Sequence, residues 1–528
     1  MLVLVGLTSA CTIELVDFLG EGDGLGDGGG SLDGATLGDG GDEDEGGGGS
    51  QGEPIPPAIF DVAGEQPQVS SCQFAAQFPS HIGCEFYGLD LDLAGLYDLD
   101  PYGFIVINPL GELAHVELSR QTGRSWETID SAFVAGEDEH VFLPTNNQAY
   151  GTGKHKGAVY RITSDQPVVV VQANPAQGEA HSSGATMLQP ASAWTAETRI
   201  AGWRTHDGVG ERSFLAILGR LSGTPLTIDL SFGLEADPDL GWTDNPLQLS
   251  VEPGEFIRLD ALATTDEVDH GTSGTLVISG QEHPSVVFSA HTCAAIPDYQ
   301  GSCGHMQEQL VSRLEGRRFV APRMVVGIDP DVGLVHERTM VQVVATEPDT
   351  TVEFIHGDGV VLETVIIDPD SPYAVAQAAH DLAVIADKPI VASAYMTNAE
   401  ITGLGSPSMV QLAPVEEWSN VHWVWVPDGY DTHLLVASSS VKTLLVEQIS
   451  VLDDLGGTPQ AEPFPAIDID TVADEQLGTR EIARVPVTAG IYRVSTDTPS
   501  SVVVAGWRVG DGFAYLGGWG SVATDPAG

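Results

Sequence analysis

The sequence predicts an all-β fold built from tandem repeats of about 110 residues, and three observations support this prediction. Short runs of alternating apolar and polar residues recur along the chain, as expected for half-buried strands. One pattern of strand, turn, proline and strand occurs four times. No long segment shows the periodicity of a helix. We expect antiparallel β-sandwich-like units, with a β-propeller as the alternative.

The repeated pattern joins two apolar strands through an acidic or polar turn and a proline. Proline suits this position because it ends the turn and opens the next strand, where no ladder donor is required. The four prolines are spaced by 117, 105 and 110 residues along the chain. They are Pro167, Pro284, Pro389 and Pro499, within residues 160–170, 277–287, 384–391 and 492–503.

Further apolar runs open each repeat, so that six or seven short strands fall in each unit. They lie at residues 104–107, 214–218, 341–344 and 434–436. This number of strands suits an antiparallel sandwich, and two short propeller blades per unit also fit. The approximate units are residues 100–184, 185–300, 301–400 and 401–528.

Acidic residues dominate the charge of the chain. Its 528 residues include 75 Asp and Glu against 21 Lys and Arg, which gives a formal net charge of −54. No basic stripe exists to neutralise phosphates, so the composition argues against a nucleic-acid partner. We expect the charge to solvate an exposed surface, with calcium binding as the alternative and no other cofactor. Asp90, Asp92, Asp98 and Asp100 are expected to be surface acids and turn formers.

The first 57 residues are expected to export and tether the protein. Residues 1–11 form a short apolar run that ends in small residues and Cys11, which is typical of a lipoprotein signal cut before a lipid-modified cysteine. A truncated secretory signal is the alternative. Residues 12–57 are acidic and glycine-rich, and we expect a disordered tether there. The folded part is expected at residues 58–528, joined to a membrane through the lipid anchor alone.

The four other cysteines suggest two disulfides, because an even number in an exported chain favours pairing. Pairing Cys72 with Cys84 and Cys293 with Cys303 closes the shortest loops. A metal site is the rival interpretation, and the absence of CxxC spacing makes it poor. We therefore expect no metal site.

The run around the second cysteine pair has a distinctive set of residues, which are His291, Thr292, Cys293, Ile296, Pro297, Cys303, His305, Glu308, Gln309 and Leu310. This set resembles the signature of the IgG Fc-binding protein N-terminal domain family. Weaker similarity extends over residues 70–520. The chain departs from the family pattern at residues 311–320, where a proline-rich turn and a Trp-Gly pair are missing. The resemblance implies an extracellular binding module, without identifying its ligand.

No catalytic residues stand out. The chain has no Gly-x-Ser-x-Gly elbow, and disulfides would remove the cysteine nucleophiles. His291, His305 and Glu308 have a spacing that invites a metal site, but we expect the histidines to pack within the loop. A glycosidase with two hidden carboxylates remains the enzyme alternative.

Two functions follow from these observations. The first is a non-enzymatic lipoprotein, at the outer membrane or cell surface, whose β-repeats bind or adhere to a protein or glycan partner. The second is a secreted carbohydrate-active enzyme on a β scaffold. For the binding function we expect the disulfide-closed loop, with Ile296, Pro297 and Tyr299, to contact the partner. The alternative is that the disulfide only secures a long connection and that the apolar residues turn inward.

Overall fold

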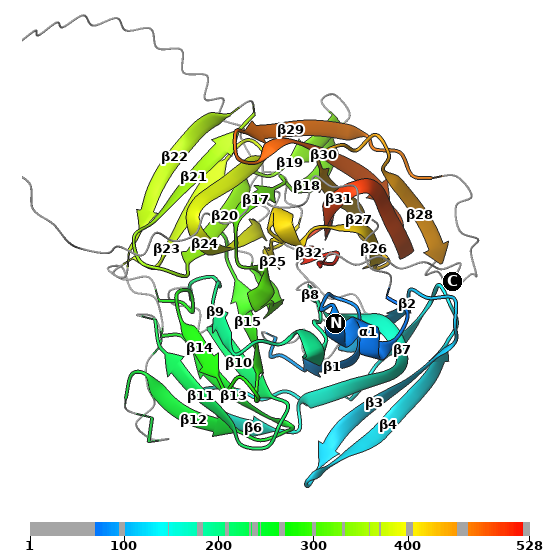
Figure 1. The fold of residues 1–528 in the computed structure, drawn as a ribbon, viewed down its shortest axis with the longest axis vertical. Coiled ribbons are helices and arrows are strands. Elements are labelled where there is room, and N and C mark those ends of the chain that lie inside the picture. Colours follow the sequence, from blue (N-terminus) through cyan, green and yellow to red (C-terminus); the bar gives the residue numbers. More distant parts are fainter. Residues whose placement is uncertain are drawn as a thin grey trace, which may run out of the picture. The chain divides into compact units, whose positions relative to one another are not determined.

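The computed structural model describes residues 69–520 within a compact unit that spans Ala58–Gly528. Gaps in this description fall at residues 94–100, 146, 177–182, 206–210, 232–233, 235–240, 243, 263–269, 298–302, 330–332, 358, 369–370, 398–404 and 451–462. Cys11, the expected tether, Asp98, Asp100 and Tyr299 lie outside the described residues. The predicted all-β fold of tandem antiparallel units is confirmed. Figure 1 shows these units in chain order, from blue to red.

Unit I is a sheet in which one long strand, β7, pairs with four neighbours. The order is β4-β3-β7-β2-β5, and β1 and β8 also pair with β7. Its elements are α1 (Cys72–Gln77), β1 (Gly83–Leu89), β2 (Gly103–Asn108), β3 (Ala114–Thr122), β4 (Ser125–Val134), β5 (Asp138–Phe142), β7 (Val159–Asn174) and β8 (Gly184–Met187).

Unit II divides the same arrangement between two sheets, of order β16-β15-β10-β13-β6 and β12-β11-β14-β9. Strand β6 comes from the chain between β5 and β7, so unit I contributes it to unit II. The elements are β6 (Gly153–Lys156), a 3-10 helix (Ala191–Ala193), β9 (Glu197–Arg199), β10 (Ser213–Gly219), β11 (Thr224–Asp229), β12 (Leu247–Val251), β13 (Glu255–Asp260), β14 (Leu276–Ser279), β15 (Ser285–Ala294) and β16 (Gly304–Leu310).

Unit III repeats the arrangement of unit I, with the order β22-β21-β24-β20-β23 and with β17 and β25 also paired to β24. A separate hairpin, β18-β19, precedes β20. The elements are a 3-10 helix (Ser312–Leu314), β17 (Gly316–Ala321), β18 (Val325–Asp329), β19 (Gly333–His336), β20 (Thr339–Ala345), β21 (Thr350–His356), β22 (Val360–Ile367), β23 (Tyr373–Ala378), β24 (Leu382–Met396) and β25 (Ser408–Gln411).

Unit IV has the order β26-β31-β27-β30-β29, with β28 and β32 also paired to β31. Its elements are a 3-10 helix (Val415–Glu417), β26 (Ser419–Val426), β27 (Asp431–Ser438), β28 (Leu445–Ser450), β29 (Asp468–Asp474), β30 (Gly478–Val487), β31 (Gly490–Arg508) and β32 (Asp511–Leu516).

The repeated prolines lie where one strand changes partners. In units I, III and IV the expected hairpin is instead a single long strand, as in β24, whose residues before Pro389 pair with β17 and β21. The residues after Pro389 pair with β20 and β25. In unit II the strands on either side of Pro284, β14 and β15, belong to different sheets. Proline fits because the ladder changes partners at this point.

Units I, III and IV therefore have two halves that share the long strand. In unit II the two halves are separate sheets. The inner halves have four strands in common, in the order β8-β7-β2-β5, β16-β15-β10-β13, β25-β24-β20-β23 and β32-β31-β27-β30. The strands at residues 184–187, 304–310 and 408–411 pair back onto the preceding unit, so the unit boundaries fall slightly later than the sequence suggested.

The four units close on one another. The innermost strands contact in a cycle, β8 with β16, β16 with β25, β25 with β32 and β32 with β8. Four hydrophobic clusters fill the spaces between units I and II, II and III, III and IV, and IV and I. The closed cycle is a feature of the propeller alternative, although each unit contributes one four-stranded inner half rather than the two short blades expected. The outer half gives each unit its sandwich-like character.

Buried polar contacts join the innermost strands. Gln189 donates its backbone N–H to Gln309 Oε1 at 2.6 Å and its side-chain Nε2–H to the Leu310 carbonyl at 2.8 Å. The Gln411 side chain likewise accepts from the Val311 N–H at 2.7 Å and donates to the Val311 carbonyl at 3.1 Å. The first and last parts of the described chain also meet, because the His81 N–H donates to the Trp519 carbonyl at 3.2 Å.

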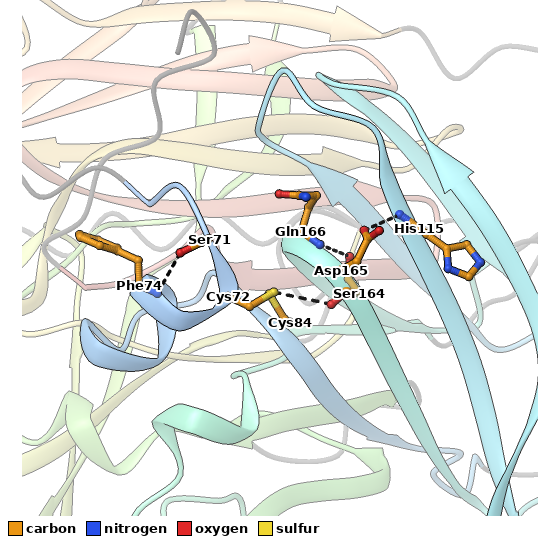
Figure 2. Close-up of a disulfide and its surroundings, with 8 residues drawn as sticks. All are labelled: Ser71, Cys72, Phe74, Cys84, His115, Ser164, Asp165 and Gln166. Atoms are coloured by element: carbon orange, nitrogen blue, oxygen red, sulfur yellow. Dashed lines mark hydrogen bonds between the residues drawn. A yellow bond between two sulfur atoms is a disulfide. The ribbon is translucent and has the colours of Figure 1, made fainter.

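The first disulfide, between Cys72 and Cys84, ties α1 to β1 (Figure 2). The Ser71 hydroxyl caps this helix by accepting a hydrogen bond from the Phe74 N–H at 3.2 Å. Asp165, in the bend of β7, accepts from the His115 N–H of β3 at 2.8 Å. The disulfide therefore fixes the start of the folded unit beside the bend of its long strand.

Candidate functional site

The second disulfide closes the connection between β15 and β16. Cys293 and Cys303 are bonded, with their Cα atoms 5.0 Å apart, so both predicted pairs are present in the structure. The connection leaves the sheet beside unit III, where β16 contacts β25. We call residues 294–302 the stapled loop.

Ile296 is buried, contrary to the expectation that it contacts a partner. Its side chain is 0% exposed and belongs to the hydrophobic cluster between units II and III. Enclosing this side chain removes apolar surface from water, which stabilises the cluster. For Ile296 the structure therefore matches the alternative in which the loop's apolar residues turn inward. Ile296 is therefore a core residue, whereas Pro297 is half-buried and remains accessible.

Two residues after β9 hold the stapled loop in place. The Trp203 indole Nε1 donates to the Ala295 carbonyl at 2.9 Å. The Arg204 guanidinium donates through Nη2 to the Pro297 carbonyl at 3.2 Å. His291 Nε2 lies 3.2 Å from the Arg204 carbonyl, so this histidine packs at the base of the loop. These contacts give the loop backbone defined partners in unit II.

A cavity of about 330 Å³ opens beside the loop, between units II and III. Its volume lies in the range of small ligand sites and of pockets for one or two side chains. Aromatic, aliphatic and amide side chains supply most of its wall. The lining residues are Trp203, Arg204 and Pro297 from unit II, and Met340, Gln342, Tyr373, Val375 and Gln377 from unit III.

The wall from unit III is one face of the pair β20-β23. Met340 stands opposite Gln377, and Gln342 stands opposite Val375, in the register of this antiparallel pair. Residues that stand opposite each other in a sheet project to the same face. Tyr373, Val375 and Gln377 alternate with three alanines along β23, so the larger side chains all project toward the cavity.

Gln342 anchors the floor of the cavity. Its Oε1 accepts hydrogen bonds from the Tyr395 hydroxyl at 3.1 Å, the Ser273 hydroxyl at 3.0 Å and the Gly202 N–H at 3.2 Å. Trp203 packs against Tyr395 with ring centroids 4.9 Å apart. Burial raises the pKa of Tyr395 well above its ordinary value, so its hydroxyl stays a donor. The floor is thus built and satisfied internally, which leaves the mouth of the cavity for an incoming group.

Near the loop, the other residues of the sequence motif are buried as neutral groups. His305 Nδ1 donates to the His291 carbonyl at 3.1 Å, and burial lowers the pKa of His305 to about 4. Burial raises the pKa of Glu308 well above its usual range, because no charged partner offsets its desolvation. Within the described residues, no group of three or more His, Cys, Asp or Glu is arranged to hold a metal ion.

The expectation of surface acids at Asp90 and Asp92 is wrong. Asp90 is 1% exposed and Asp92 is 8% exposed. Asp92 pairs with Arg258 Nη1 at 2.9 Å, and Arg258 Nε also donates to Asp260 at 2.6 Å. Arg258 comes from β13, so Asp92 is buried where an arginine of unit II meets the end of unit I. Asp90 instead accepts a hydrogen bond from the Asn147 N–H.

A second, larger cavity of about 920 Å³ lies between units I and II. It contains the carboxylates of Glu252 and Glu255. Glu255 pairs with Lys156 at 2.6 Å, and a hydrogen bond from the Ser222 hydroxyl lowers the pKa of Glu252. A glycosidase needs one carboxyl with a raised pKa as its acid, whereas the pKa of Glu252 is lowered and Glu255 is engaged by a lysine.

Sequence reasoning found the loop but missed the strand that faces it. Trp203 and the β23 residues Tyr373 and Val375 were not expected to share a site with Pro297, because they are distant in sequence. The alternation of large side chains with alanine over residues 373–378 was the available signal. This alternation indicates a strand with large side chains on one face and alanines on the other, closely packed face.

The described helices are all too short, or too polar, to cross a bilayer. The two disulfides are typical of proteins that fold in an oxidising compartment, at the surface or outside the cell. The fold and the disulfides together define an extracellular-type β-repeat protein, with a cavity between two of its units.

The chain belongs to the IgGFc binding protein family, whose profile matches residues 184–506. The match begins at β8 and ends within β31, so it covers units II and III and most of unit IV. The resemblance predicted from the stapled loop is confirmed. No curated protein matches the chain.

Two solved structures show remote similarity. One is described as "Biofilm associated protein - BSP domain", at 7% identity over 88% of this chain and 96% of that chain, with a TM-score of 0.15. The other is a tetra-tandem repeat in the extending region of a large adhesion protein, at 8% identity over 84% of this chain and 99% of that chain, with a TM-score of 0.09. These scores are too low to support an argument about fold or function.

Proposed function

We propose that this chain is an exported binding protein that holds a protein partner at the cavity between units II and III. The observation that supports this proposal most strongly is the cavity itself. There Trp203 and Pro297 of unit II meet Tyr373 and Val375 of β23. Aromatic and aliphatic side chains around a preformed cavity are the usual anchors of protein recognition. The IgGFc binding description of the family supports a protein rather than a glycan as the partner.

The stapled loop contributes to this proposal by limiting the cost of binding. A loop that is already closed by a disulfide and hydrogen-bonded through Ala295 and Pro297 loses little freedom when a partner docks. Pro297 lines the cavity, and we keep Tyr299 as a proposed contact of the same loop. Ile296 supports the loop from inside the core.

We further propose that Cys11 carries a lipid and that residues 12–57 act as a spacer. The short apolar run before Cys11 and the acidic, glycine-rich composition after it support this assignment. An anchored spacer would present the binding unit to partners away from the membrane. Metabolic labelling with a fatty acid tests the anchor: label should enter the wild type and be lost in Cys11→Ala, and an unlabelled wild type would remove the anchor.

Site-directed photo-crosslinking tests the proposed binding site. A photoreactive phenylalanine analogue at position 375 should give a discrete adduct with one protein, either purified immunoglobulin Fc or a protein of the envelope extract. The control places the same analogue at position 113, where Leu113 is 56% exposed on another unit. The same adducts at both positions, or none at 375, would place the binding site elsewhere.

A further inference from the structure

We propose that the outer edge of β23 accepts an extended segment of the partner as an added β-strand, with one of its side chains entering the neighbouring cavity. This inference rests on the proposed function, because it names how the partner engages the same site. It requires a strand edge that is available, chemically permissive and next to a recognition pocket. The structure of unit III meets these three requirements in turn.

The edge is the first requirement. β23 stands last in the order of its sheet, and β20 is its one ladder partner among the strands that the structure describes. Successive residues of an edge strand point their N–H and C=O groups alternately toward the sheet and away from it. The outward groups of residues 374–378 pair with no other described strand, and they offer a hydrogen-bonding ladder to another extended chain.

Strand addition already occurs at the equivalent edge of two other units. β13 of unit II pairs with β6, which comes from unit I. β30 of unit IV pairs with β29, the strand that precedes it. In both cases a fifth strand extends the four-stranded inner half. Unit III has the same four strands, β25-β24-β20-β23, and no fifth strand is seen in the described part of the chain.

Unit I shows how the same edge is closed without a strand. β5 carries Asp138 and Glu139, and Glu139 accepts a hydrogen bond from the Ser450 hydroxyl of unit IV at 2.7 Å. Just before β5, Glu137 pairs with Arg493 of unit IV at 3.1 Å. Charges along an edge strand, and contacts that cover it, prevent pairing with another chain. Of the four equivalent edges, that of β23 is therefore the one that neither a strand nor such charged contacts cover within the described residues.

The sequence of β23 has none of the usual features that block pairing. Its six residues, Tyr-Ala-Val-Ala-Gln-Ala, include no proline and no charge. Val375 is 40% exposed although it is aliphatic and lies in the middle of the strand. The opposite edge of the sheet, β22, is also apolar and exposed, but none of its residues lines the cavity.

The cavity specifies the chemistry of the added segment. Residues of an added strand that stand opposite Tyr373, Val375 or Gln377 project to the same face as these residues, where Trp203 and Met340 also lie. A large apolar side chain fits this wall. Because the chain has a net charge of −54, an acidic segment would be repelled. The expected occupant is an extended, neutral or basic peptide segment with an apolar residue at every second position.

A defined peptide tests this proposal on residues 58–528. The probe is fluorescein-labelled Lys-Thr-Val-Thr-Phe-Thr-Val-Thr-Lys, and binding is followed by fluorescence anisotropy. Two further peptides are N-methylated, one on the threonines and the other on the valines and phenylalanine. Because alternate amides face the strand edge, we expect one methylated peptide to bind at least tenfold more weakly and the other to bind like the parent.

Hydrogen exchange locates the added strand. The parent peptide should slow exchange at least tenfold at alternate amides of residues 373–378, since these acquire new acceptors. Val375→Asp should weaken binding at least tenfold. The matched control is Val360→Asp, which makes the same substitution at an exposed valine on the other edge of the sheet and should bind like the wild type.

Four results would overturn the proposal: no binding of the parent peptide, equal binding of both methylated peptides, protection outside β23, or a dimer of the free protein that Val375→Asp dissolves. The last result would make a second copy the occupant. The proposed function can hold even if strand addition fails. A partner that crosslinks at position 375, together with equal binding of both methylated peptides, would mean that side chains alone hold the partner.

Discussion

Ile296 and Pro297 are neighbours in the chain and have different roles. Ile296 is enclosed in the cluster between units II and III, and Pro297 lines the cavity. The sequence marked both as apolar loop residues, and loops do not have the alternation that separates buried from exposed positions in strands. The distinction depends on Trp203 and Arg204, which fix the loop backbone from another element. Such contacts between distant residues are not visible in a single sequence.

Replacing Ile296 tests its core assignment. Ile296→Ala removes apolar contacts and leaves a space, so we expect the free energy of unfolding to fall by about 2–5 kcal/mol. Urea denaturation followed by circular dichroism measures this change. Leu113→Ala, at an exposed position, should have a much smaller effect. A loss for Ile296→Ala no larger than that of the control would mean that the side chain is not enclosed.

Glu337 should make the stability depend on pH. Burial raises its pKa from 4.5 to about 8, although its Oε2 accepts from the Thr397 N–H at 2.8 Å. The folded protein keeps a proton that the unfolded chain releases above about pH 4.5. The contribution of this group is therefore full below about pH 4.5 and is lost progressively as the pH rises through about 8.

The substitution Glu337→Gln should remove this part of the pH dependence. The free energy of unfolding, measured by urea titration at several pH values, should fall less steeply between about pH 5 and 8 than in the wild type. The control is Glu363→Gln, at an exposed position of β22, which should keep the wild-type slope. Equal slopes in all three proteins would contradict a buried, protonated Glu337.

At the scale of elements, the sequence predicted the strands better than their connections. The alternating runs and the four prolines were recognised, and so were both cysteine pairs. The hairpins predicted around the prolines are long strands such as β24, or strands of separate sheets, as with β14 and β15. A local pattern cannot distinguish these outcomes, because they depend on distant strands. At Pro389, β24 changes from pairing with β17 to pairing with β20.

The disulfide of the stapled loop should stabilise both the fold and the binding site. Cys293 and Cys303 are 10 residues apart, so replacing both with serine should cost about 2–3 kcal/mol of unfolding free energy. Partner affinity should also fall, because the loop regains freedom. The matched control replaces Cys72 and Cys84, which are 12 residues apart, and should lose similar stability while retaining affinity. Equal affinities of the two double variants for the partner would mean that the stapled loop does not contribute to binding.

At the scale of the molecule, the sequence revealed the number of units but not their closure. The propeller alternative was considered because two short blades could fit within one repeat, whereas the six or seven strands per unit favoured a sandwich. The deciding contacts join units about a hundred residues apart or more, such as Gln189 with Gln309 and His81 with Trp519. The candidate cavity has the same origin, because it lies between two units and exists only once they pack.

Closure predicts that residues 58–528 unfold as one cooperative system. Each hydrophobic cluster is shared by two units, so no unit can unfold without exposing the clusters on both of its sides. Tryptophan fluorescence and far-ultraviolet circular dichroism should give the same urea midpoint. His81→Ala, which removes the contact of the imidazole Nδ1 with the Trp519 backbone, should lower this midpoint for both signals together. Two separated transitions in the wild type would show that the units are independent.

The most direct measurement of the central claim is the affinity of a cavity-filling variant for the partner captured at position 375. Val375→Trp places a large side chain in the mouth of the cavity, where Val375 is already partly exposed. Val360→Trp makes the same change on β22, where none of the residues lines the cavity. By biolayer interferometry, we predict at least tenfold weaker binding for Val375→Trp, with unchanged melting temperature, and wild-type affinity for Val360→Trp. Wild-type affinity for both variants, or an equal loss in both, would contradict binding at the cavity between units II and III.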